Sequence, residues 1–253
     1  MPRPIVFDLF HTLVHGADEE RDRVVGEMAL IVGVAPAELV AAYHGSWRDR
    51  LVGWDVAETV RILTGRLGGS PTDEQVARAA AHRRALARRV LGGVSTGTLD
   101  VLDALRERGH PLALISNATS ETAEAWADGP LARRFDVAVF SCEVGLAKPD
   151  PAIYRTTAKR LGVAPVDCFY VGDGADGELA GAAAVGMMVL RTTEHQDTDP
   201  GWDGPVIATL RDLPARLGSR PRSPVRRDDV TDRGDTTARS DPPPAAEVAS
   251  WHG

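Results

Sequence analysis

The sequence of 253 residues is poor in cysteine and lysine, with two of each, and only 5% of its residues are aromatic. Cys142 and Cys168 lie in apolar runs without metal-ligand spacing, so we expect both to be packing residues. No apolar run approaches the roughly 18 residues of a membrane span, and no signal-peptide region precedes the first apolar run. These absences predict a soluble, cytoplasmic protein that does not span a membrane.

The sequence also lacks a block of positive charge. Its formal net charge is -7, and the basic residues alternate with acidic ones. A nucleic-acid-binding surface requires a basic patch or stripe, so we expect no nucleic-acid partner. A small anionic substrate would instead need a local positive site. With 43% hydrophobic residues, the chain is long enough for one substantial core and a smaller appended domain.

Short apolar runs alternate with longer segments of helical period, and Gly, Pro, Asn or Asp residues bound each run. The runs are Ile5–Leu9, Leu112–Ser116, Val137–Cys142, Cys168–Val171 and Met187–Leu190. Runs that are short and almost wholly apolar are typical of strands buried on both faces, and the helical segments between them provide the crossovers of a parallel sheet. The pattern predicts an α/β fold with a doubly wound parallel sheet.

One long segment interrupts this alternation, because residues 16–91 read as consecutive helices without a convincing strand. We interpret it as an inserted all-helical domain within a core made of residues 1–15 and 92–218. Ser70-Pro71-Thr72-Asp73 predicts a helix start in which Ser70 caps the helix and Pro71 is its first residue. Residues 219–253 are rich in Arg, Asp, Ser, Thr and Pro, and we predict a disordered tail there.

Polar residues follow the predicted strands at the edge where open α/β sheets bind ligands. Asp8 ends the first strand, Ser116 the second, and Asp173 the fourth, while Lys148 follows the third. An aspartate at a strand end is often only a turn or cap residue. A carboxylate nucleophile, however, needs charge neutralisation, a cation and a donor for substrate oxygens, and the other three residues offer these functions.

Lys148 is notable because arginine is the usual cation of this sequence. A compact ammonium can bridge a nucleophilic carboxylate and a substrate oxygen, whereas a planar guanidinium would crowd such a site. The alternative is a solvated lysine that precedes a proline turn. We expect the second lysine, Lys159, to lie on the surface of the following helix.

Asp173 belongs to an acidic cluster with Asp176 and Glu178 in a glycine-rich turn before a helix of small residues. Acidic residues favour helix N-termini for electrostatic reasons alone. Several carboxylates that meet Asp8 would nevertheless repel one another unless a divalent cation lay among them. Hard oxygen ligands then indicate Mg²⁺.

Four segments together resemble the four motifs of the haloacid dehalogenase (HAD) superfamily in order and spacing, over about residues 3–215. They are Phe7-Asp8-Leu9-Phe10-His11-Thr12-Leu13, Ile115-Ser116-Asn117, Lys148-Pro149-Asp150-Pro151 and Val171-Gly172-Asp173-Gly174. The helical insertion resembles the C1 cap of that superfamily, which closes over the site and selects the substrate. The resemblance therefore supports the predicted fold.

The resemblance also implies roles for the residues of these motifs. Asp8 would be the nucleophile, Ser116 would bind the transferred group, and Lys148 would steady the charge. The metal ligands would be Asp8, Asp173, the backbone carbonyl of Phe10 and a second acid, for which Glu178 matches better than the competing Asp176. Further substrate contacts would come from Asn117 and from the segment Phe10-His11-Thr12.

The sequence departs from the phosphatases of this superfamily at Phe10, where they have an aspartate that acts as general acid and base. His11 is adjacent, but in a continuing strand it would point to the opposite face. The 2-haloacid dehalogenases also have an aromatic residue there, since a departing halide needs no proton. They lack the metal-binding aspartate, however, which this sequence retains as Asp173.

We give the acidic cluster more weight, because carboxylates gathered without a cation repel one another strongly. The sequence thus predicts a hydrolase with an aspartate nucleophile, most consistent with a Mg²⁺-dependent phosphatase of a small phosphorylated metabolite. A 2-haloacid dehalogenase-like hydrolase and a catalytically weakened binding or regulatory protein are the alternatives. Within the insertion, His44, Trp47 and Arg48 either contact substrate or pack between helices.

Overall fold

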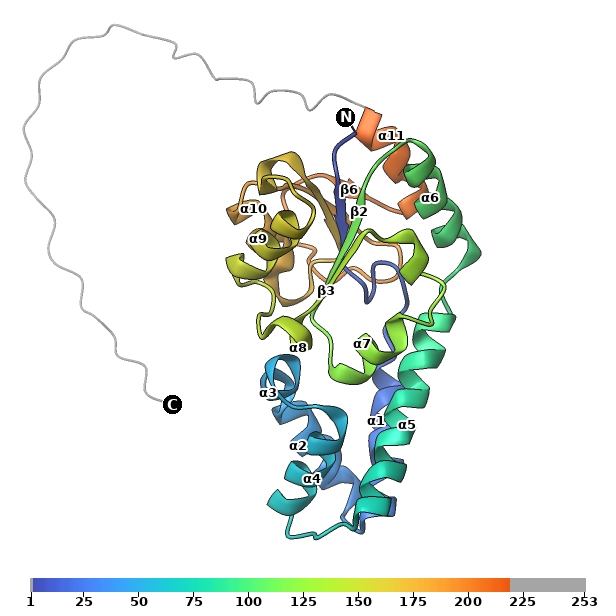
Figure 1. Ribbon diagram of the computed structural model, residues 1–253, viewed down its shortest axis with the longest axis vertical. Coiled ribbons are helices and arrows are strands. Elements are labelled where there is room, and N and C mark those ends of the chain that lie inside the picture. Colours follow the sequence, from blue (N-terminus) through green and yellow to red (C-terminus); the bar gives the residue numbers. More distant parts are fainter. Residues whose placement is uncertain (1, 219–253) are drawn as a thin grey trace, which may run out of the picture. The chain divides into compact units, whose positions relative to one another are not determined.

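The computed structural model describes residues 2–218 (Figure 1). The predicted disordered tail, residues 219–253, lies outside the described residues. The chain up to Gly218 groups as one compact unit, so its division into a core of residues 1–15 and 92–218 and a cap of residues 16–91 stays a prediction. No helix in the described part of the chain has both the length and the hydropathy of a membrane span.

Six parallel strands form one sheet in the order β3-β2-β1-β4-β5-β6, which confirms the doubly wound α/β fold. The strands are β1 (Ile5–Phe7), β2 (Leu112–Ser116), β3 (Val137–Phe140), β4 (Phe169–Gly172), β5 (Met188–Thr192) and β6 (Val206–Ile207). The first five coincide with the predicted apolar runs to within two residues at each end. The sixth was not predicted, because two residues carry no periodic signal. The order reverses between β1 and β4, where such folds bind their ligands.

Successive side chains of the central strands point to opposite faces of the sheet and fill two hydrophobic cores. Phe7 of β1 joins one core and Val6 the other. Helices α6 (Thr96–Glu107) and α11 (Leu213–Gly218) cover the first face, and α9 (Pro151–Arg160) and α10 (Glu178–Ala184) cover the second (Figure 1). The short helices α7 (Ser120–Trp126) and α8 (Ser141–Val144) follow the ends of β2 and β3.

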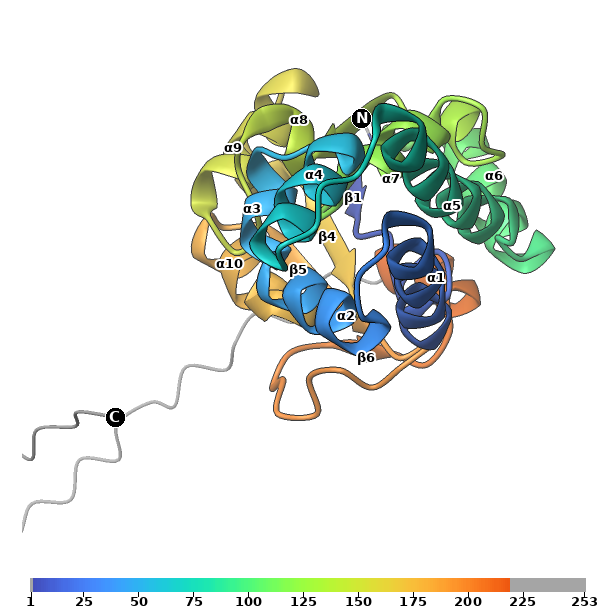
Figure 2. The ribbon, with the colours of Figure 1, turned by 90° about the horizontal axis from the view of Figure 1, so that it is seen from below.

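The segment between β1 and α6 contains five helices and no strand, as predicted. They are α1 (Asp18–Val32), α2 (Pro36–Gly45), α3 (Trp47–Val52), α4 (Val56–Arg66) and α5 (Asp73–Gly92), seen from below in Figure 2. Their apolar faces form a third core. The predicted start of α5 was wrong by two residues. Thr72 caps the helix, and it and Gln75 form a reciprocal capping box, in which each side chain accepts a hydrogen bond from the backbone N–H of the other residue.

Several side-chain contacts join this helical segment to the strand-end region. The backbone N–H of Val56 donates to Ser120 Oγ at 3.0 Å. Arg83 of α5 donates through Nε and Nη2 to Glu121 Oε1 of α7, and both side chains are buried. A buried, hydrogen-bonded ion pair has strict geometry, so it fixes where α5 lies beside the sheet.

Candidate active site

Asp8 lies immediately after β1, in the middle of the sheet. Its backbone N–H donates to the carbonyl of Val171 at 2.9 Å, which keeps the chain attached to β4 at this point, and its side chain is buried. Because β1 ends at Phe7, strand alternation does not extend to His11. His11 has a left-handed backbone (φ 59°) in the turn that follows. The objection that His11 would point away from the site therefore does not apply.

Lys148 reaches Asp8 from the loop after β3. Its ammonium donates to Asp8 Oδ1 at 2.5 Å and also to Glu178 Oε2, and it lies 3.3 Å from the hydroxyl of Tyr170. Asn117 holds the backbone of this lysine from both sides, since Oδ1 accepts from Lys148 N–H at 2.7 Å and Nδ2 donates to Lys148 O at 3.0 Å. The residue that follows β2 thus fixes the position of Lys148.

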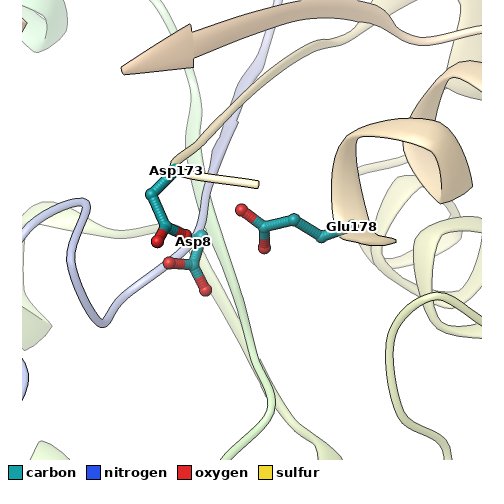
Figure 3. Close-up of side chains that lie close together, drawn as sticks. All are labelled: Asp8, Asp173 and Glu178. Carbon is teal, nitrogen blue, oxygen red and sulfur yellow. The ribbon is translucent and has the colours of Figure 1, made fainter. Parts of the chain in front are cut away.

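Three buried carboxylates gather at this point: Asp8, Asp173 at the end of β4, and Glu178 at the start of α10 (Figure 3). One oxygen of each lies within 4.8 Å of the others. Asp173 accepts a hydrogen bond from Thr198 Oγ1 at 2.5 Å, and Glu178 accepts one from the N–H of Gly174 at 3.1 Å. These bonds aim the carboxylates at a common point.

Asp176 takes a different position. It has a left-handed backbone (φ 56°), it is exposed, and it accepts a hydrogen bond from Asn117 Nδ2 at 3.0 Å. Of the two acids that compete in sequence, Glu178 is the one that lies with Asp8 and Asp173.

The proximity of the charges changes their acidity. Burial and the neighbouring Asp8 carboxylate raise the pKa of Glu178 to about 8, and burial raises the pKa of Asp8. Burial alone would lower the pKa of Lys148, but the Asp8 and Glu178 carboxylates outweigh it, so its pKa lies above the ordinary value. Lys148 therefore stays an ammonium, as a charge-stabilising residue must.

The donor set fits a magnesium ion. If all three carboxylates were ionised, they and the one ammonium would give this buried group a formal charge of -2. A divalent cation would neutralise it, and carboxylate oxygens are the ligands that Mg²⁺ prefers. Two buried hydroxyls from the same motifs, Ser116 Oγ and Thr12 Oγ1, have no hydrogen-bond partner within residues 2–218. Such groups are costly unless a ligand or water satisfies them.

A cavity of about 200 Å³ opens beside Asp8 and Lys148 and extends to the helical segment. Phe10, His11 and Asn117 lie in its wall. Ser116, Thr12, Asp173 and Glu178 are buried and do not line it. Of the predicted residues, the structure thus gathers Lys148, Asp173 and Glu178 around Asp8.

Residues of the helical segment complete the cavity. Of the three sequence candidates there, Trp47 lines it, whereas His44 pairs with Asp22 and Arg48 is exposed outside it. Arg21 and Arg83 line it and were not predicted.

Two further polar residues were missed near the carboxylates. Tyr170 donates from its hydroxyl to Glu178 Oε2 at 2.6 Å, and Thr198 bonds Asp173. A tyrosine in a strand buried on both faces needs a hydrogen-bond partner, which was a usable signal for Tyr170. Thr198 lies in a loop after β5, and nothing in the sequence singles it out.

Several curated relatives of this chain are phosphatases. Phosphoglycolate phosphatase 1 from Pseudomonas aeruginosa is 30% identical over 222 residues, which cover 84% of this chain and 79% of that protein. Glyceraldehyde 3-phosphate phosphatase from Methanopyrus kandleri is 34% identical over 122 residues, or 47% of this chain. In this second case the chain spans about half the relative's length, 52%.

The fold also occurs in solved structures of HAD enzymes. The crystal structure of a dehalogenase is 20% identical and has a TM-score of 0.57, over 86% of this chain and 98% of that chain. At this identity the likeness concerns the fold alone. The model of the haloacid dehalogenase-like hydrolase family matches residues 3–186. This chain therefore belongs to the haloacid dehalogenase-like hydrolases, and it is an enzyme of the hydrolase class.

Proposed function

We propose that this protein is a Mg²⁺-dependent phosphatase that uses Asp8 as its nucleophile and acts on a small phosphorylated substrate. The proposal rests on the position of the Asp8 carboxylate. It bonds the Lys148 ammonium and lies beside the Asp173 and Glu178 carboxylates, at the carboxyl ends of the central strands. The phosphatase relatives support the same activity for the family.

Each residue has a definite task in this reaction. Asp8 attacks phosphorus in line with the leaving oxygen, forms an aspartyl phosphate, and is released when water hydrolyses it. The Lys148 ammonium stabilises the negative phosphoryl oxygens, and the free hydroxyl of Ser116 donates to one of them. Mg²⁺ would be held by Asp8, Asp173 and the backbone carbonyl of Phe10, with Glu178 as the second acid, and would supply charge neutralisation.

Glu178 and Asn117 act on Lys148 in this proposal. Glu178 Oε2 accepts from the ammonium, and Asn117 holds the lysine backbone through two hydrogen bonds. Both contacts limit the motion of the ammonium relative to Asp8. A cation held in advance at the point where charge develops stabilises the transition state without reorganisation.

Chelation of divalent cations should lower the hydrolysis of acetyl phosphate and p-nitrophenyl phosphate at least about a hundredfold, because the cation supplies several kcal/mol of charge stabilisation. Adding Mg²⁺ back should restore it. The same assays should include 2-chloropropionate, since the aromatic residue at position 10 also suits a dehalogenase. Halide release that survives chelation, with no phosphate release, would contradict the proposal. Turnover of any of these substrates excludes a purely regulatory protein.

Replacing Phe10 with aspartate should raise kcat for phosphate esters with poor leaving groups, such as glycerol 3-phosphate, by about a hundredfold. The physical reason is that a positioned general acid and base typically contributes about 10²- to 10⁴-fold. Phe10→Asn is the matched control, because it removes the same partly buried ring without adding a proton donor. Equal rates for the two variants would show that the missing acid is not the limitation.

A further inference from the structure

One face of α5 forms an apolar wall of the cavity. Leu86, Ala87, Val90 and Leu91 follow Arg83 at the spacing of a single helix face and all line the cavity. Phe10 lines it next to Asp8, and Trp47 of α3 lines it as well. Apolar cavities of roughly 150 Å³ hold a benzene ring, so a cavity of about 200 Å³ has room for one substituted ring.

The cations of the helical segment that line this cavity are already neutralised. Arg83 forms two hydrogen bonds with the buried Glu121 carboxylate, and its side chain is 9% exposed. Arg21 bonds Asp18 at 2.7 Å and Asp22 at 3.1 Å. In the part of the cavity that the helical segment lines, a carboxylate on the substrate would meet no free positive charge and would still be desolvated.

Phe10 also restricts the leaving group, because no carboxyl group stands at this position to protonate a departing alkoxide. An unassisted leaving group must be a stable anion, and a phenolate satisfies this requirement where an alkoxide does not. The apolar wall and the absence of a carboxyl group at position 10 are separate features, and both favour the same chemistry.

From these observations we infer that the substrate is a phosphate monoester of an uncharged phenol, with its ring against Phe10, Trp47 and the α5 wall and its phosphoryl group at Asp8. The inference rests on the proposed phosphatase function and adds the class of leaving group. Asp8 forms a bond to phosphorus as the P–O(aryl) bond breaks, and the phenolate leaves with that electron pair. Water then cleaves the aspartyl phosphate and releases phosphate.

The test compares 4-methylphenyl phosphate with 4-carboxyphenyl phosphate in the presence of Mg²⁺. The two esters have similar size and leaving groups of comparable acidity, but only one carries a distal charge. We expect kcat/KM to be at least about tenfold higher for the methyl compound, since the charged group must be desolvated without a partner. Equal values, or a preference for the carboxylate, would overturn the inference.

Acetyl phosphate, which has an acidic leaving group and no ring, separates the two levels of the proposal. If it is hydrolysed while the methylphenyl ester is not preferred, the inference fails and the phosphatase function stands. If no phosphate compound is hydrolysed, both fail.

Trp47→Ala should lower the ratio of kcat/KM for 4-methylphenyl phosphate to that for acetyl phosphate by about fivefold, since an aromatic contact with the ring is lost. Trp54→Ala is the matched control, because Trp54 packs in the helical core and under Arg66 and does not line the cavity. An equal fall of the ratio in both variants would also overturn the inference.

Discussion

Replacing Asp8 with asparagine is expected to lower kcat for acetyl phosphate by at least about 10⁴-fold, because removing a nucleophile leaves only transition-state binding. The fold should survive. Burial, and to a lesser extent the Asp173 carboxylate, raises the pKa of Asp8, so a neutral amide costs less to bury at this position and relieves the repulsion with Asp173. We therefore expect the Tm of the variant, measured without divalent cations, to equal or exceed that of the wild type.

Steady-state kinetics, thermal denaturation and mass spectrometry of acid-quenched protein together test this prediction. The wild type should carry a phosphoryl group on Asp8 during turnover, and the asparagine variant should carry none. Asp167→Asn is the control, because Asp167 is an exposed aspartate before β4 and is not part of the carboxylate cluster. Full turnover by the Asp8→Asn variant would show that Asp8 is not the nucleophile, whether the enzyme is a phosphatase or a dehalogenase.

Replacing Lys148 with methionine should lower kcat/KM by about 10³-fold and also destabilise the protein. Methionine keeps much of the side-chain volume but removes the ammonium that bonds Asp8, Glu178 and Tyr170. Removing one partner of a buried ion pair typically costs about 3 kcal/mol or more of unfolding free energy. Denaturant titration without divalent cations measures this cost, and kinetics with Mg²⁺ measure the loss of activity.

The second lysine provides the matched control. Lys159 is exposed on α9, so Lys159→Met should change neither the unfolding free energy nor kcat/KM beyond the small effects typical of surface positions. If Lys148→Met leaves activity intact while it lowers stability, the lysine is structural and the proposed charge stabilisation is wrong.

The strands that position the site were predictable because each is a local pattern. Runs that are apolar on both faces mark buried parallel strands, and the carboxyl ends of parallel strands share one edge. This geometry brings Asp8 and Asp173 together although 165 positions separate them. Lys148 was predictable because lysine is rare in this sequence and because this lysine lies in the loop after a predicted strand. The choice between Asp176 and Glu178 needed the structure, because the left-handed backbone at Asp176 turns that side chain toward Asn117.

The helical segment was predictable as helices, and its resemblance to a C1 cap predicted a part in substrate selection, but the sequence did not show which of its residues face the cavity. Periodicity shows that Leu86 and Val90 share a face of α5, yet that face could equally have met another helix. Trp47 was one of three candidates, and only packing separated it from His44 and Arg48.

The sequence by itself determined the doubly wound sheet, the inserted helices and the group of residues at the strand ends. These features depend on hydrophobic periodicity and on polar residues that directly follow a strand, and both are properties of residues close together in the sequence. Only the tertiary structure decided that Arg83 is neutralised by Glu121 and that one face of α5 lines a cavity with Phe10. The net charge and polarity of a cavity depend on pairs distant in the chain, and long-range packing selects those pairs.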